Sequence, residues 1–174
     1  KWRAVVNPIA SRECVEDLEK NRKKTLTIWD YHCLEGTPGC ALEPQFANMI
    51  YFHSVAKKTR VRKLRKGEDP LSEMYGIIKP EYNPKNYVNI DFLNNIEKFD
   101  KVIIGGEAKS HCVMESIKQI LEHYETRTEV TKKIYILDDC MSIIPGFEDA
   151  TAQAFDEFKT KYHVNLVNST DSIL

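Results

Sequence analysis

The stretch Lys101–Leu121 constrains the fold more than any other part of the sequence. It begins with the apolar run Val102-Ile103-Ile104, passes through two glycines and a polar connector, and becomes amphipathic from Cys112 onward. An apolar strand that leads through a glycine turn into a helix is one half of a β-α-β unit. The pattern therefore predicts a strand followed by a helix, with Cys112 in the first turn of that helix.

The segments after this stretch continue the alternation of strand and helix. We expect strands at Lys133–Asp138 and His163–Val167, a polar loop at Glu125–Lys133, and a helix at Asp149–Lys161. Because β-α-β-α-β order produces parallel strands with helices on the sheet faces, the sequence predicts an α/β fold. We expect one domain over residues 1–174, with three α/β/α layers and a mostly parallel sheet.

Before Lys101 the pattern is weaker. Pro8 is expected to block regular structure at the start, and Ser11 is expected to cap a helix that runs to about Asn21. We also expect a strand at Lys24–Trp29, a core-packing helix at Gln45–Lys58 and a short helix at Ile90–Phe99. The basic run Thr59–Lys66 is interpreted as a solvated strand or loop. Val61 and Leu64 are apolar residues that are compatible with a short strand there.

Composition excludes several classes of function. The 174 residues carry a net charge of -1, so neither nucleic acid nor a membrane surface is expected as a partner. No apolar run of transmembrane length or signal-peptide pattern occurs in the sequence. The five cysteines are odd in number, scattered and without a CxxC pair, which favours reduced thiols and a cytoplasmic location.

Two loops contain candidate functional side chains. The free backbone N–H groups and the dipole at a helix start favour an anion, so Cys112 is either a reactive thiolate or a buried structural cysteine. In the loop 30–40, Asp30, His32, Cys33 and Cys40 are residues of metal-binding type, and the alternative is a tight turn with a hydrogen-bonded histidine. Asp138 and Asp139, after a predicted strand, are interpreted as turn and cap residues.

Three separated blocks resemble one family, the isochorismatase-like cysteine hydrolases, and nicotinamidases in particular. Residues 29–39, WDYHCLEGTPG, resemble the family's W-x-x-H-C-x-x-G-T-x-G loop. Residues 66–70, KGEDP, followed by SEMY at 72–75, resemble its lysine-glycine segment and downstream tyrosine. Residues 106–113, GEAKSHCV, resemble the G-x-A-x-x-x-C-V block that contains the nucleophile. The blocks occur in family order.

The resemblance implies an Asp–Lys–Cys triad that cleaves the C–N amide bond of a small molecule through a thioester. Cys112 would be the nucleophile and Lys66 the lysine beside it. The N–H groups of Ala108 and Cys112 would form the oxyanion hole, after a cis peptide bond between Glu107 and Ala108. The implied substrate-pocket residues are Tyr75 and His111, the implied ligand of a divalent metal such as zinc is His32, and a homo-oligomer is expected.

The sequence also departs from the family pattern. The family's general-base aspartate lies on a first strand that has no counterpart before Lys24, and the family's upstream metal-binding D-x-H is also absent. We expect a missing N-terminal segment to supply them. The alternative is a non-catalytic member that acts as a binding or scaffold protein. Vinyl-ether hydrolysis of the isochorismatase type is disfavoured because it uses no cysteine nucleophile, and Cys112 is in place.

Overall fold

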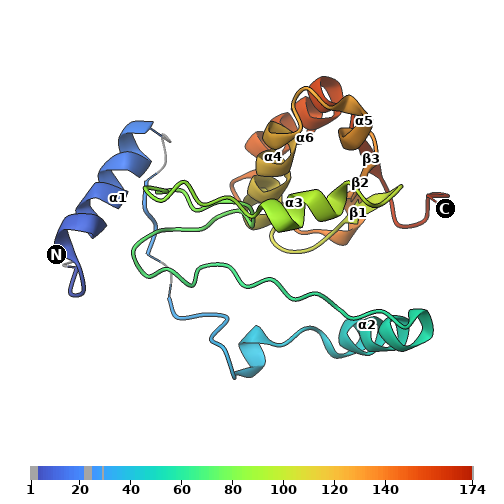
Figure 1. Ribbon diagram of the computed structural model, residues 1–174, viewed down its shortest axis with the longest axis horizontal. Coiled ribbons are helices and arrows are strands. Elements are labelled where there is room, and N and C mark those ends of the chain that lie inside the picture. Colours follow the sequence, from blue (N-terminus) through green and yellow to red (C-terminus); the bar gives the residue numbers. More distant parts are fainter. Residues whose placement is uncertain (1–3, 22–24, 29, 174) are drawn as a thin grey trace. The chain divides into compact units, whose positions relative to one another are not determined.

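The computed structural model describes residues 4–21, 25–28 and 30–173 (Figure 1). The chain divides into two compact units, one made of 1–14 with 66–174 and the other of 15–65. Each unit is described here by itself. The prediction of a single domain over the whole chain stays a prediction.

The larger unit contains a parallel sheet of three strands. β1 (Val102–Ile104), β2 (Ile134–Leu137) and β3 (Asn165–Val167) are ordered β1-β2-β3, and both pairings are parallel (Figure 1). Ile103 is opposite Tyr135, and Tyr135 is opposite Asn165, which fixes the register across the sheet. The predicted α/β class with parallel strands is therefore confirmed.

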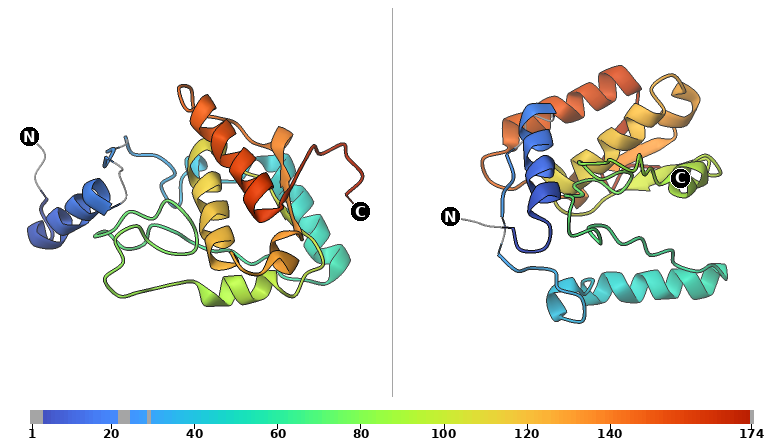
Figure 2. Two further views of the ribbon diagram at one scale, coloured as in Figure 1. Left: turned by 90° about the horizontal axis from the view of Figure 1, so that it is seen from above. Right: turned by 60° about the vertical axis from the view of Figure 1, so that its left-hand side comes forward.

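Helices connect the strands and bury one face of the sheet. The helices of this unit after residue 66 are α3 (Ile90–Ile96), α4 (Met114–His123), α5 (Thr128–Thr131) and α6 (Glu148–Tyr162). α4 and α6 lie side by side (Figures 1 and 2). Ile134 and Ile136 of β2 are completely buried in one hydrophobic cluster with residues of these helices, including Leu93, Ile117, Leu121, Phe155 and Phe158. On the other face of the sheet, Ile103 keeps 48% of its surface exposed.

Polar contacts join the end of α4 to α3. The buried Tyr124 donates its hydroxyl to the carbonyl of Leu93 at 2.8 Å and to Glu97 at 3.2 Å. Burial, followed by the neighbouring Glu97 carboxylate, raises the pKa of Tyr124 to about 12, so the phenol stays protonated and remains a donor. Arg127 donates two hydrogen bonds to the carboxylate of Glu97, at 2.8 and 3.1 Å.

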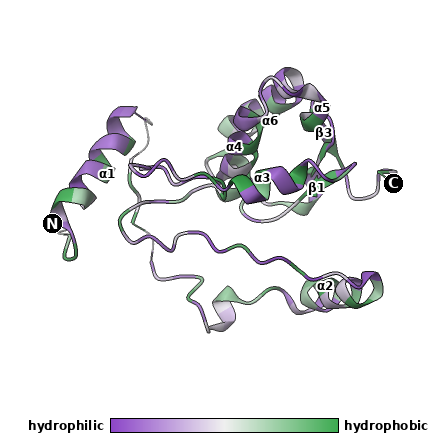
Figure 3. Cartoon of the chain, in the orientation of Figure 1, coloured by the Kyte–Doolittle hydropathy of each residue, from purple (hydrophilic) through white to green (hydrophobic). Residues whose placement is uncertain are grey.

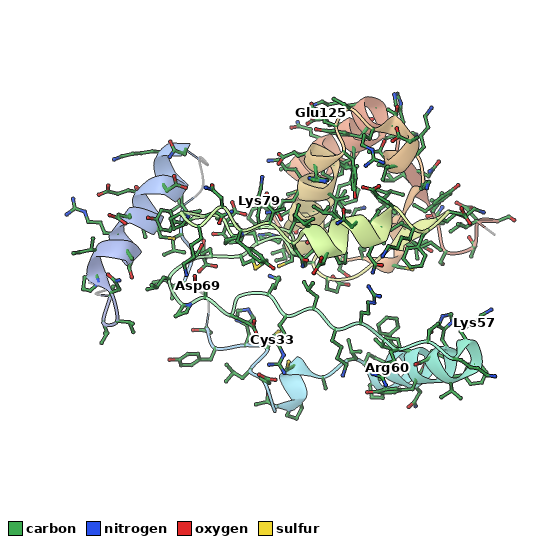
Figure 4. All side chains as sticks on the ribbon, in the orientation of Figure 1. Cys33, Lys57, Arg60, Asp69, Lys79 and Glu125 are labelled. Atoms are coloured by element: carbon green, nitrogen blue, oxygen red, sulfur yellow. The ribbon has the colours of Figure 1, made fainter. Side chains whose placement is uncertain are left out.

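The other unit contains fewer regular elements. α2 (Pro44–Lys57) begins with a proline in its first turn and with Glu43, whose carboxylate accepts a hydrogen bond from the N–H of Phe46 at 2.8 Å. It ends at Lys58, which adopts a left-handed conformation with φ of 52°. The segment after α2 is irregular and mostly hydrophilic (Figure 3). Figure 4 labels Lys57, the last residue of α2, and Arg60, which lies in this segment. The short 3-10 turn Pro38–Cys40 precedes α2.

Several sequence predictions for the first 65 residues are wrong. Residues 25–28 form no strand, and the ends of the predicted strand, 24 and 29, lie outside the described residues. α1 (Pro8–Asn21) begins before Ser11: Pro8 occupies its first turn, and the side chain of Asn7 accepts from the N–H of Ala10 at 3.1 Å. Proline fits a first helical turn because the N–H that it lacks has no partner there.

Other predictions need smaller corrections. None of the residues of α2 is buried, so its expected core role is not observed. The loop expected at Glu125–Lys133 contains the short helix α5. Residues 59–65 form no strand, and the basic run is exposed, in agreement with the loop interpretation. Within the part of the chain that is described, no helix is long and apolar enough to cross a membrane.

Candidate active site

Cys112 lies in a wide turn that connects β1 to α4. The carbonyl of Ala108 accepts hydrogen bonds from the N–H groups of His111 at 3.1 Å and Val113 at 3.2 Å, and the second closes a π-helical turn over Lys109–Val113. α4 starts only at Met114, so the prediction that Cys112 opens the α-helix is wrong by two residues. The peptide bond between Glu107 and Ala108 is cis, which is the geometry that the family resemblance implied.

The side chain of Lys66 approaches the thiol from a distant part of the chain. Its Nζ lies 3.3 Å from Sγ of Cys112 and donates to the carbonyl of Met74 at 3.1 Å. Gly67, the next residue, has φ of +76°, a left-handed conformation that side chains with a β-carbon rarely adopt. The turn that follows Lys66 therefore favours a glycine at position 67. A cation beside a thiol favours the thiolate, which is the nucleophilic form.

A buried glutamine holds the segment that follows Met74. Oε1 of Gln119, on α4, accepts hydrogen bonds from the N–H groups of Ile78 at 3.1 Å and Lys79 at 3.2 Å. Its Nε2 donates to the carbonyl of Lys79, labelled in Figure 4, at 3.1 Å. Sequence analysis did not identify Gln119, because its partners lie about 40 residues away and leave no local pattern.

His111 and Ser110 occupy the same turn as Cys112. Ser110 Oγ accepts from the N–H of Ile144 at 3.1 Å and is 2.8 Å from Nδ1 of His111. The ring of His111 meets that of Phe147 edge-on, with centroids 4.5 Å apart. Phe147, 45% exposed, is an aromatic side chain beside the turn that contains Cys112, and sequence analysis did not single it out.

Tyr75 lies among carboxylates. Burial raises the pKa of Tyr75 to about 12, and the negative charges of Glu73 and Glu81 add to the shift. The phenol is therefore a neutral donor throughout the physiological range. Its assignment to a substrate pocket stays a prediction, as does that of His111.

The loop around His32, in the smaller unit, forms a tight turn. Nδ1 of His32 is hydrogen-bonded to the carbonyl of Asp30 at 2.6 Å, and the carbonyl of Leu34 accepts from both the N–H and the hydroxyl of Thr37. Cys33, labelled in Figure 4, has φ of +50°. Across residues 4–21, 25–28 and 30–173, no group of three or more His, Cys, Asp or Glu side chains could hold a metal ion. The described donors thus do not make a metal site, and the role of His32 as a ligand stays a prediction.

Comparison with known proteins identifies the fold. No protein-family model and no curated protein matches the sequence. A crystal structure of the yeast nicotinamidase bound to the inhibitor nicotinaldehyde matches with a TM-score of 0.57 and 20% identity, over 83% of this chain and 60% of that one. A second structure of the yeast nicotinamidase matches with a TM-score of 0.56 and 21% identity, over 86% and 64%.

A pyrazinamidase of Pyrococcus horikoshii in complex with zinc matches over 92% of this chain and 85% of that one, at 16% identity. Its TM-score of 0.49 is too low to support an inference. The chain spans less than two thirds of the length of the yeast nicotinamidase chains that it matches. It has the α/β fold of these yeast nicotinamidase structures.

Proposed function

We propose that the chain belongs to a cysteine hydrolase that cleaves the C–N amide bond of a small molecule, with Cys112 as nucleophile. The observation that carries the proposal is the 3.3 Å separation of Lys66 Nζ and Cys112 Sγ. These two residues are the ones that the family resemblance pairs, and they come from segments 46 residues apart.

The first chemical step forms a thioester. The thiolate of Cys112 attacks the amide carbonyl carbon, and the carbonyl oxygen becomes an oxyanion. The N–H groups of Ala108 and Cys112 are proposed to stabilise that charge, an effect worth about 2.7–4 kcal/mol per donor in a well-studied case. The C–N bond then breaks, and the leaving nitrogen takes a proton that the Lys66 ammonium is placed to give.

The second step restores the enzyme. Water gives a proton back to Lys66 while its oxygen attacks the thioester carbon, the C–S bond breaks, and the carboxylic acid leaves with Cys112 again a thiolate. The net reaction is amide plus water giving acid plus ammonia. No step is routed through a metal, because the donors described around His32 do not make a metal site.

The proposed substrate class is supported by the shared fold and by the Lys66–Cys112 contact. Nicotinamide is the first amide to test, since the yeast enzyme that shares the fold is a nicotinamidase. Nicotinaldehyde, an inhibitor of that enzyme, is a suitable probe because an aldehyde adds reversibly to a reactive thiolate. The expected homo-oligomer and cytoplasmic location stay predictions.

The decisive experiment measures ammonia release from nicotinamide and a panel of small amides. Wild-type protein is expected to turn over at least one of them, and Cys112→Ala none. Cys140→Ala, which removes an exposed thiol, is the matched control and should keep the wild-type rate. No turnover of any amide, together with a Cys112 that reacts with iodoacetamide no faster than Cys140, would leave the binding or scaffold interpretation.

A further inference from the structure

A buried lysine lies three residues before Cys112 in the same turn. The side chain of Lys109 is only 11% exposed, and its Nζ is 2.6 Å from Oδ1 of Asp138. The same ammonium lies 4.9 Å from the ring centroid of Phe155 on α6. A lysine is almost never buried unless it is paired, because removing its charge from water is costly. The Lys109–Asp138 contact is thus what allows this side chain to lie inside the fold.

Backbone and side-chain contacts tie the same connector to the segment after β2. The N–H of Lys109 donates to the carbonyl of Ser142 at 2.9 Å, and the N–H of Ser142 donates to Oε2 of Glu107 at 3.1 Å. One residue further along the connector, Ser110 accepts from the N–H of Ile144. Residues 107–110 are therefore held to residues 138–144 by hydrogen bonds. The Lys109–Asp138 contact is the one among them that joins two charged side chains.

We propose that Lys109 and Asp138 are a positioning pair, which sets the turn so that Cys112 Sγ lies beside Lys66 and the N–H groups of Ala108 and Cys112 face the developing oxyanion. This inference rests on the proposed function. Hydrogen bonds between two charged groups are shorter and roughly twice as strong as neutral ones, and their direction restricts both partners. Misplacing a reacting group by about 1 Å costs on the order of 100-fold in rate.

The Lys109 side chain can be changed without removing the other contacts that hold the fold together. The hydrogen bonds of Lys109 N–H, Glu107 and Ser110 do not use the lysine side chain. The core around Ile134 and Leu121 is built from other residues. Replacing Lys109 by methionine keeps an apolar stem of similar length against Phe155 and removes only the charge. We therefore expect a folded protein whose Cys112 turn is less well defined.

The test compares wild type with Lys109→Met, Asp138→Asn and the double variant. Each is treated with iodoacetamide, and the alkylation rates of Cys112 and of the exposed Cys140 are measured in the same tube by peptide mass spectrometry. In both single variants the Cys112 rate at pH 7 should fall about tenfold relative to Cys140. The double variant should fall no further than the singles, because the two residues act as one unit.

Affinity for nicotinaldehyde gives a second readout, and it should weaken in parallel with the alkylation rate. Thermal unfolding verifies that each variant is folded at the assay temperature. Asp139→Asn is the matched control: Asp139 neighbours Asp138 but accepts from the N–H and hydroxyl of Ser169. Because Asp139 also accepts from the thiol of Cys140, the Cys112 rate in this variant is compared with that of the exposed Cys40, and the ratio should be unchanged. If Lys109→Met does not fold, the alkylation rates of Asp138→Asn alone test the positioning role. The Asp138 side chain is 41% exposed and asparagine has the same shape, so this variant is expected to fold.

The outcomes distinguish this inference from the proposed function. A wild-type Cys112 that reacts faster than Cys140, with a ratio unchanged within twofold in the folded single variants, overturns the positioning role and leaves the proposed hydrolase intact. A wild-type Cys112 that reacts no faster than Cys140 overturns both.

Discussion

Gln119 leaves no room for a β-carbon at Gly76. A methyl group built on Gly76 would lie 2.4 Å from Oε1 of Gln119, far inside van der Waals contact. The same glutamine is hydrogen-bonded to the backbone of Ile78 and Lys79. The segment 76–79 therefore cannot move away from α4 without losing those hydrogen bonds. Because Met74 lies just before it and accepts from Lys66, Gln119 acts indirectly on the position of the lysine.

Gly76→Ala is therefore expected to destabilise the protein. The added methyl overpacks the contact with Gln119 and should cost about 1–3 kcal/mol in the free energy of unfolding, measured by urea denaturation. Gly39→Ala is the control, because its nearest neighbour would be Thr37 Oγ1 at an ordinary 3.6 Å. Equal stability of the Gly76 and Gly39 variants would contradict the close approach.

Lys66→Met should make Cys112 less reactive without unfolding the chain. Nζ of Lys66 lies 3.3 Å from Sγ of Cys112, and a cation beside a thiol makes it more reactive, so removal of the lysine should slow iodoacetamide labelling of Cys112 at pH 7 about tenfold or more. Lys63→Met, three residues earlier in the exposed basic run, is the matched control. Similar slowing in both variants would mean that the effect comes from net charge and not from the contact.

Stability should depend on pH through Glu97. The hydrogen bonds from Arg127 hold the pKa of this carboxyl below its ordinary value of 4.5. A carboxyl with a lowered pKa stabilises the folded state above its ordinary pKa, and the contribution is lost as pH falls through the lowered value. The melting temperature of Arg127→Met should thus lie below that of wild type at pH 7, and the gap should shrink towards pH 2.

Lys98→Met, an exposed lysine close to Glu97 in sequence, is the control for this pH series. Its melting curve should follow that of wild type at every pH. A gap between Arg127→Met and wild type that stays constant from pH 7 to pH 2 would rule out ionisation of Glu97 as the cause.

The two units should respond differently to loss of apolar side chains. Leu121→Ala removes a completely buried residue of α4 and should cost about 2–5 kcal/mol in the free energy of unfolding. Phe46→Ala removes a larger side chain from α2, but Phe46 is 57% exposed, and the cost should stay within about 0.5 kcal/mol. Chemical denaturation of both variants tests this contrast, and a comparable loss for Phe46 would show that α2 contributes to a core.

The part of the fold after Lys101 could be predicted from sequence because its signals are local. Continuous apolar runs mark β1 and β2, and the amphipathic spacing of α4 and α6 is undisturbed by proline. The strand expected at Lys24–Trp29 rested on β-propensity and on the alternation of threonines with Leu26 and Ile28. A strand also needs a neighbour to pair with, and propensity says nothing about whether one is there.

Some residues of the candidate site also have a local sequence signal, and others do not. Cys112 and Lys66 could be identified because each lies in a short motif that resembles a known family. Lys109 and Gln119 could not, since a buried lysine that pairs 29 residues away has the same local sequence as an exposed one. Asp138 was interpreted as a turn residue, and the turn is present, but its ion pair depends on how β2 ends beside the Cys112 connector. Such contacts arise from tertiary structure and have no local signal.

The ties between residues 107–110 and 138–144 have a consequence for the order in which the chain is made. Synthesis runs from the N-terminus, so Cys112 leaves the ribosome well before Asp138, Ser142 and Ile144. Until those residues emerge, the Cys112 thiol is present but the groups that bind its turn are not. A nascent chain that ends before Asp138 would thus contain the thiol and Lys66 as an ordinary flexible pair, and the thiol would reach its final setting only after β2 and the turn behind it had been added.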